Sequence, residues 1–407
     1  MKRIYLSTVF SNLILFAGLS AGFVNADELM DSYQESTRLM NEGQYAQAIP
    51  YAERAYNASM KKFGRLHKTT NTLAMNFGTI TLFAGNFEDA RPLLRRALKN
   101  SETIYGENAA NNVDPLIRLA QALGTTHDKE AQWKVERNMK DASELYGRAV
   151  EIAQPVIGSE AVAGIEIEAA MVFARSPFGY EYGLEIAKQA DEHLKNSQNV
   201  EARARAKLWV GILSSRMEDP ETAEKVLSEA LNLPGSEQIS VQTKRAIHVA
   251  LVRYYESQED SEKATPHVKA LSTLSPTVGR SLSQISPIYW TYPDWKSLKR
   301  LPSKQVGVVV EFAIDEDGFI KDAKVVESAG EDADTVVLAS INNWRYVLPS
   351  NDGKIEPIEM VRYEFKIPGR GKARQLGTKI SGLDPIRGVS DSAPIGDVLQ
   401  GGLRSGG

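Results

Sequence analysis

The sequence of 407 residues contains no cysteine. This absence excludes disulfide bonds, thiolate metal sites and cysteine nucleophiles together. Histidine is scarce too: there are five, and no two have the i, i+4 spacing of a metal site on a helix. P-loop, dinucleotide-binding and nucleophile-elbow motifs are also missing. We therefore predict that the protein is not an enzyme and has no catalytic residues, no metal site and no small-molecule cofactor.

Neither sign of charge is in large excess. The chain has 48 Lys and Arg against 52 Asp and Glu, which gives a formal net charge of −4. Duplex nucleic acid selects proteins with a strongly positive surface, so we predict no nucleic-acid partner. The hydrophobic share of 42% and charged share of 25% are ordinary for globular protein.

Charged residues are absent from Ile4 to Ala26, a run that follows the basic start Met-Lys-Arg. The run ends in small residues before Asp27, as a secretory signal peptide does before its cleavage site. We predict that residues 1–26 are a signal peptide. The alternative is an uncleaved membrane anchor, because about 20 uncharged residues can span a bilayer. Both interpretations place the body of the protein outside the cytoplasm.

The middle of the chain is repetitive. The segments Gly43–Ala55 and Gly85–Ala97 align without gaps, 42 residues apart. A pair of small residues seven positions apart recurs later at Ala142/Ala149, Gly183/Ala190 and Ala223/Ala230, with a weaker copy at Ala264/Leu271. Seven residues are two helical turns, so each pair lies on one helix face and lets a neighbouring helix approach closely. Helical hairpins repeated about every 40 residues indicate an α-solenoid.

The first two repeats resemble the tetratricopeptide repeat (TPR) family in its longer form of 40 to 42 residues. The resemblance rests on Gly43, Tyr45, Ala48 and Ala55 and on the matching Gly85, Phe87, Ala90 and Ala97. We predict a TPR-like array over residues 27–280, with five to six helical hairpins. The resemblance implies a concave groove that binds a protein or peptide partner. The spacing reflects core packing, so we assign no groove residue to a site.

A different pattern follows a predicted linker over residues 281–288. Alternating apolar residues predict a strand over Val306–Ile314, and Asp315–Gly318 predicts a hairpin turn before a second strand. Acidic residues from Glu331 begin a predicted helix that ends at Trp344-Arg345-Tyr346, and Ile358–Ile367 alternates as a final strand. The fold class is therefore mostly α: a TPR-like solenoid followed by a small α+β domain of ββαβ order over residues 289–368. We predict that the Gly-rich tail, residues 369–407, is disordered or extended.

The final module resembles the C-terminal domain of the TonB energy-transducer family over Ser286–Pro368. The resemblance rests on an ordered set of residues: Tyr292-Pro293, Phe312, Asp317-Gly318, Ser328, Trp344-Arg345-Tyr346 and Phe365-Lys366-Ile367. It implies a periplasmic location and the capture of an extended segment, the TonB box, from an outer-membrane receptor. The captured segment adds as a strand to the edge of the last strand and satisfies its unpaired backbone groups.

Carried over to this chain, the resemblance implies a partner-strand site formed by Tyr292, Pro293, Ile358, Met360, Val361, Arg362, Tyr363, Glu364 and Phe365. The alternative is that Arg362, Glu364 and Lys366 blunt this edge, because charged side chains discourage strand pairing. The N-terminal run has no histidine and no Pro-rich spacer precedes the module. The resemblance therefore covers the domain fold and does not extend to coupling with proton flow.

These observations predict a periplasmic binding protein of the TonB type, acting as transducer or accessory in TonB-dependent transport across the outer membrane. Its predicted partners are an outer-membrane TonB-dependent receptor or another envelope protein, and a protein or peptide in the TPR groove. Two alternatives stay open. One is an envelope scaffold without a transport role, in which the C-terminal domain pairs with itself as a homodimer. The other is a transducer anchored in the inner membrane by its uncleaved N-terminus.

Overall fold

The structure is a computed structural model that describes residues 24–125, 130–274, 287–298, 306–348, 350–351 and 354–367. The predicted signal sequence up to residue 23 and the predicted tail from residue 369 lie outside the described residues. The chain divides into two compact units, Met1–Met217 and Glu218–Gly407. This division falls among the helices, so the last helices before the sheet belong to the second unit.

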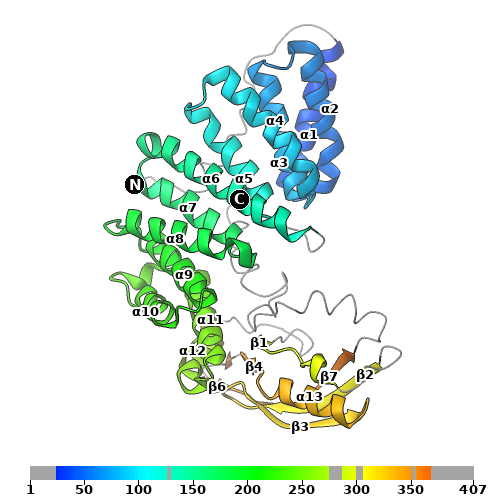
Figure 1. The fold of residues 1–407 in the computed structure, drawn as a ribbon, viewed down its shortest axis with the longest axis vertical. Coiled ribbons are helices and arrows are strands. Elements are labelled where there is room, and N and C mark those ends of the chain that lie inside the picture. The colour runs from blue at the N-terminus through cyan, green and yellow to red at the C-terminus, as the bar shows by residue number, and fades with distance from the viewer. Residues whose placement is uncertain are drawn as a thin grey trace. The chain divides into compact units, whose positions relative to one another are not determined.

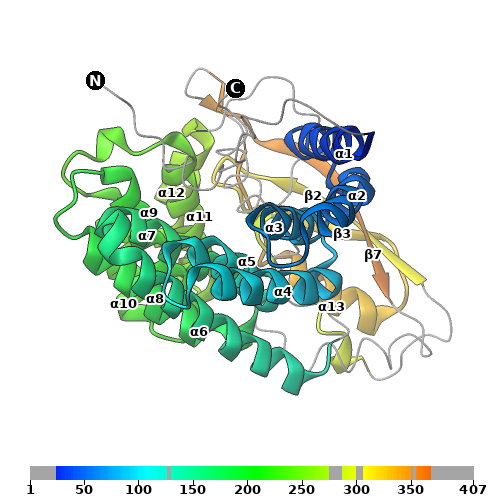
Figure 2. The same cartoon turned by 90° about the horizontal axis from the view of Figure 1, so that it is seen from above.

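The first unit is helical throughout its described part. Consecutive helices lie side by side and are joined by short connections (Figures 1 and 2). The α-helices are α1 Val24–Asn41, α2 Tyr45–Phe63, α3 Lys68–Phe83, α4 Phe87–Tyr105, α5 Val113–Gly124, α6 Gln132–Ile157, α7 Ser159–Phe173, α8 Tyr180–Leu194 and α9 Val200–Arg216. Short 3-10 turns at Ala110–Asn112 and Pro177–Gly179 precede α5 and α8.

The repeated small residues of the sequence lie on the even-numbered helices, from α2 to α12. The alanines at positions 48, 55, 90, 97, 142, 149, 190, 223, 230 and 264 are each 0% exposed. The repeated glycine has its own role. Gly43 and Gly85 have φ of 72° and 83° in the turns before α2 and α4, a backbone conformation that glycine adopts without strain. The structure thus confirms the predicted TPR-like solenoid.

One helix of the array, α9, has no clear polar face. Buried side chains follow one another from Leu208 to Ser214. The reason is that α9 contacts both α7 and α8, so more than one of its faces is covered.

The second unit begins with three helices, α10 Pro220–Leu231, α11 Val241–Ser257 and α12 Ser261–Leu274, with a 3-10 turn at Ser236–Gln238. Asp219 caps α10, since its side chain accepts a hydrogen bond from the backbone N–H of Thr222. This confirms the helix start that the Asp219-Pro220 pair predicts.

The remaining elements form the α+β domain: β1 Pro287–Tyr289, a 3-10 turn Trp295–Ser297, β2 Val306–Ile314, β3 Ile320–Glu327, α13 Glu331–Ile341, β4 Arg345–Tyr346, β5 Ser350–Asn351, β6 Lys354–Ile355 and β7 Ile358–Ile367. The main sheet is antiparallel, with strand order β3-β2-β7. Short pairs β1-β4 and β5-β6 complete the described strands. The predicted order of strand, strand, helix and strand is confirmed, and the short strands are additions to it.

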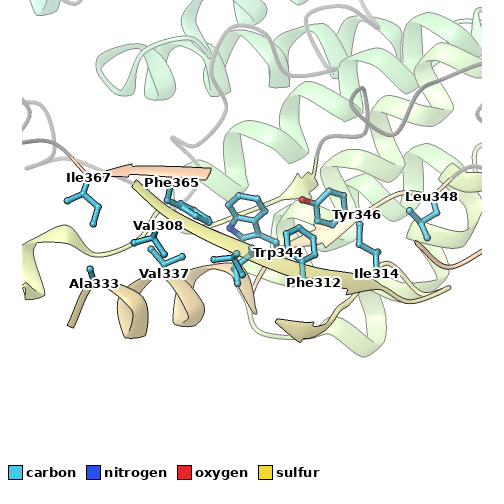
Figure 3. Packing of buried hydrophobic residues seen from close by; sticks show 12 residues of the cluster. Val308, Phe312, Ile314, Ala333, Val337, Trp344, Tyr346, Leu348, Phe365 and Ile367 are labelled. Atoms are coloured by element: carbon cyan, nitrogen blue, oxygen red, sulfur yellow. The ribbon is translucent and has the colours of Figure 1, made fainter. Parts of the chain in front are cut away.

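The core of this domain lies between α13 and one face of the sheet (Figure 3). Val308, Val310, Phe312 and Ile314 supply the apolar face of β2, as their alternation predicts, and Val337 faces them from α13. The turn between β2 and β3 requires Gly318, whose φ is 86°. A β-carbon there would lie 2.0 Å from the carbonyl oxygen of Tyr346.

The helix ends earlier than predicted. α13 stops at Ile341, and Trp344 lies in the turn that leads into β4. Trp344 and Tyr346 are nonetheless buried in the core, with 5% and 3% of their surface exposed. Trp344 is therefore a core residue that lies in the turn after the helix and not at the end of the helix as predicted.

Candidate partner-strand interface

The outer strand β7 has a free backbone edge in the described structure. β7 pairs with β2 on one side, and no described strand pairs with its other side. Pairing runs without interruption from Val361 opposite Phe312 to Ile367 opposite Val306. Seven consecutive residues in regular register leave an ordered row of N–H and C=O groups along the outer edge, which is the template that an added strand needs.

The other edge of the sheet, formed by β3, is irregular. The register of β2 with β3 shifts twice, between Val309 and Val310 and between Glu311 and Ala313. Asp322 within β3 has φ of 52°, a left-handed conformation that is unusual for a residue with a side chain. Bulges and twisted residues are common means of blocking edge pairing. The sheet therefore has one blunted edge and one regular edge, and the regular edge is β7.

The two faces of β7 differ in chemistry. Val361, Tyr363, Phe365 and Ile367 share the face that covers the core, because they pair with the inward residues of β2. Tyr363 is 43% exposed despite facing that side, and Met360 at the start of the strand is 65% exposed. A strand added beside β7 would meet the exposed ring of Tyr363 on the core side of the sheet.

The charges of β7 are largely engaged with neighbours on the opposite face of the sheet. Arg362 forms ion pairs with Glu327 on β3 and, at 4.0 Å, with Glu311 on β2. Lys324 also pairs with Glu311, at 3.6 Å. Glu364 lies over Gly307, where a β-carbon would come within 2.8 Å of its Oε1 atom. These side chains extend across the sheet, so Arg362 and Glu364 are poorly placed to block the outer edge.

Aromatic side chains gather beside β7. The Trp344 ring lies 5.2 Å from the Tyr363 ring in an edge-to-face arrangement, and the Tyr363 and Phe365 rings are 4.9 Å apart. Burial raises the pKa of Tyr363, and the nearby hydroxyl of Tyr292 raises it further. The predicted residues Tyr292 and Tyr363 thus lie close enough to interact electrostatically, although 71 positions separate them in the sequence.

Hydrogen bonds hold the segment that carries Tyr292. The carbonyl oxygen of Thr291 accepts a hydrogen bond from Nε1 of Trp344 at 3.0 Å and one from Oγ of Ser340 at 2.6 Å. The side chain of Tyr292 is 56% exposed, but Pro293 is buried. Among the predicted site residues, Tyr292, Met360 and Tyr363 are available to a partner, while Pro293 and Phe365 are inside the domain.

Sequence reasoning missed the most buried polar residue of this domain. Arg345 is 1% exposed, and its guanidinium carbon lies 3.5 Å from the centroid of the Phe319 ring. Its Nη1 atom donates to Glu256 at 3.0 Å, and its Nη2 atom to Thr265 at 2.6 Å. Both partners lie on α11 and α12, so no pattern within the C-terminal segment could reveal this contact.

A small three-stranded sheet with one covered face, one blunted edge and one regular edge has the geometry that strand addition needs, and it is attached here to a helical repeat array. Residues 301–367 match the family described as Gram-negative bacterial TonB protein C-terminal. The resemblance inferred from the sequence is thereby confirmed, and the module is a TonB-type C-terminal domain. Comparison with curated proteins gives no match.

Solved structures similar to this chain include proteins with TPR repeats. The TPR-like repeats of a protein assigned as a kinesin light chain from Podosopora anserina have 14% identity and a TM-score of 0.44, over 53% of this chain and 99% of that one. BtubC from P. vanneervenii has 17% identity and a TM-score of 0.39, over 65% and 99%. A tetratricopeptide repeat protein from Parabacteroides merdae has 13% identity and a TM-score of 0.36, over 62% and 95%. Because these scores are low, we base the repeat assignment on this chain's own helices.

The described residues contain no cluster of three or more His, Asp or Glu that could hold a metal ion. Within the same ranges, no helix combines the length and the hydropathy needed to cross a bilayer.

Proposed function

We propose that the protein is a periplasmic binding protein of Gram-negative bacteria whose β7 edge captures an extended segment of a partner. The observation that carries this proposal is the contrast between the regular free edge of β7 and the twice-shifted edge of β3. The family of the C-terminal domain supports a partner in the envelope. We assign the protein to TonB-dependent transport, as transducer or accessory, with an outer-membrane receptor as the source of the segment.

The helical array supplies a second binding surface in this proposal. Stacked helical hairpins expose one continuous face, which such arrays use to hold a protein or peptide. The protein would then connect two partners, one held by the array and one captured by β7. Neither partnership requires catalysis, a metal or a cofactor.

Amide hydrogen exchange of the full chain tests the capture. The probe is a set of synthetic peptides that carry the TonB-box sequences of outer-membrane receptors from the same organism. We expect slower exchange in residues 358–367 and unchanged exchange in residues 320–327, because an added strand would give amides of β7 new hydrogen-bond partners. No protection at millimolar peptide, or protection of β3 instead, would contradict the proposal.

Two alanine variants sharpen this test. Tyr363→Ala removes an exposed aromatic group from β7, and Val326→Ala removes an apolar side chain of similar exposure from β3, 43% against 40%. We expect Tyr363→Ala to weaken peptide binding about fivefold, on the order of 1 kcal/mol for a cross-strand aromatic contact. Val326→Ala should leave the affinity unchanged. Protection of β7 that rises with protein concentration in the absence of peptide would favour the homodimeric scaffold instead.

A further inference from the structure

The contacts of Arg345 form a joint between the C-terminal domain and the helices α11 and α12. The side chain of Arg345 reaches out of β4 to Glu256 and Thr265, while its Nε atom donates to the carbonyl oxygen of Asp317 at 3.0 Å. A single guanidinium therefore holds three elements at once: α11, α12 and the turn between β2 and β3. The side chain of Glu256 is only 8% exposed, so this ion pair is shielded from water.

Apolar side chains are also buried in this joint. Ile288 of β1 is 6% exposed and belongs to a cluster with buried residues of the two helices: Val249, Val252, Val268 and Leu271. The carbonyl oxygen of Ile288 accepts a hydrogen bond from Nε of Arg253 at 3.0 Å. At the rim, Lys269 forms an ion pair with Asp317 at 2.8 Å. The joint thus has an apolar centre, a buried ion pair and a polar margin, as stable protein interfaces do.

Separation of the joint would be costly. A buried ion pair adds little net stability when it forms, whereas loss of one partner from the docked pair leaves a buried unpaired charge and is strongly destabilising. The main cost of moving the domain away from α11 and α12 would be exposure to water of Ile288 and the apolar side chains packed around it. These contacts favour one docked position of the domain.

The residue before Arg345 extends the joint to the free edge. Trp344 lies edge-to-face with Tyr363 on β7, and its indole N–H donates to Thr291, the neighbour of Tyr292. Arg345 thus contacts α11 and α12, and the adjacent Trp344 contacts the exposed ring of Tyr363 on β7. The orientation of β7 follows from the docking of Arg345.

We propose that α11 and α12 are a built-in platform for the C-terminal domain and that Arg345 is the positioning residue that sets the direction in which β7 faces. The folding unit then includes these helices and does not begin at the linker. What β7 captures rests on the proposed function, whereas the docking itself does not.

Distance measurement between two spin labels tests the platform in the full chain. The absence of cysteine makes labelling specific, and Glu262→Cys on α12 with Glu331→Cys on α13 places the labels on exposed residues of the two parts. We expect one narrow distance distribution in the otherwise native protein. Arg345→Met should lose this single distance and give a broad distribution. Lys324→Met, which removes a positive charge from an exposed site on β3, should keep it.

Glu256→Gln is a second variant that keeps the test valid if Arg345→Met unfolds the domain. It retains a hydrogen-bonding group but leaves the Arg345 charge unpaired, and we expect the distribution to broaden while the amides of β2 stay protected from exchange. A broad distribution in the native protein would overturn the platform, as would a narrow one in both Arg345→Met and Glu256→Gln. A narrow native distance together with failed peptide binding would reject the proposed capture and leave the platform standing.

Discussion

Trp344 and Arg345 are adjacent in the chain and both are buried. Trp344 lies in an apolar core cluster, whereas Arg345 pairs with Glu256. The burial of Trp344 is what an aromatic side chain favours, and Trp344 shares one core cluster with Val337 and Ile341. The burial of Arg345 could not be predicted, because arginine is rarely buried unless a partner neutralises it. That partner, Glu256, lies 89 positions earlier in the sequence. Local patterns contain no trace of such a pairing.

A second pair of side chains gives the second unit a predicted sensitivity to acid. The Nδ1 atoms of His248 and His267 are 3.0 Å apart, and Tyr255 stacks on the ring of His267. Burial lowers the pKa of both imidazoles, and burial together with the proximity of His267 lowers that of His248 to about 4. In the unfolded chain their pKa returns to the ordinary value near 6.5.

The unfolded chain therefore binds more protons than the folded one at pH values between about 6.5 and about 4. The contribution of these histidines to stability is complete above that window and is lost as the pH falls through it. Other groups titrate in the same range, so the comparison must be with a matched variant. Between pH 7 and 4.5 we expect the free energy of unfolding of the native protein to fall by about 1 to 3 kcal/mol more than that of the double variant His248→Gln/His267→Gln. This range includes a discount for the partial exposure of both rings. Urea unfolding at each pH measures the difference, and equal losses would contradict the prediction.

Helices of the repeat array are specified locally, because the small residues that allow close packing recur at helical spacing. A prediction follows for α4. Ala97→Leu should lower the free energy of unfolding by about 1 to 3 kcal/mol, since Ala97 is 0% exposed and a larger side chain would overpack the contact. Lys99→Leu, at an exposed position of the same helix, should change it by less than about 0.5 kcal/mol.

Far-UV circular dichroism during urea unfolding of the full chain measures both changes. Equal effects of the two leucines would mean that the spacing of small residues does not reflect helix packing in this array.

Strands were predictable where their side chains alternate and unpredictable where they are short. Alternation in β2 and β7 indicated both the strands and their inner faces, and Asp315–Gly318 indicated the turn. β1, β4, β5 and β6 have two or three residues each, too few for a period to be visible. β1 and β4 form because backbone groups from distant segments meet, whereas β5 and β6 pair with each other at close sequence separation.

The molecule as a whole depends on export for the proposed function. If residues 1–26 are a signal peptide, the mature protein starts at Asp27 and collects in the periplasmic fraction. Mass spectrometry of the N-terminal peptide from cells that express the full sequence decides this. A chain that starts at Met1 and sediments with inner membranes would instead support the anchored transducer.

The division of the chain into compact units follows from packing. Composition indicates where the helical repeat gives way to alternation, near residue 280. The compact units divide between Met217 and Glu218, and within the second unit α11 and α12 share a buried cluster with β1. Domain limits depend on which surfaces are buried together, and that is decided by contacts between segments distant in sequence.

The sequence alone indicates the fold class of each half of the chain, the repeat, the ββαβ order and the strand whose edge is a candidate site. These are properties of period and spacing, and neighbouring residues carry them. Only the tertiary structure decided that β3 is irregular while β7 is regular, that Tyr292 lies within electrostatic reach of Tyr363, and that Arg345 contacts α11 and α12. Each of these depends on register or on burial between distant segments, where hydrogen bonds and ion pairs form only after the chain has folded.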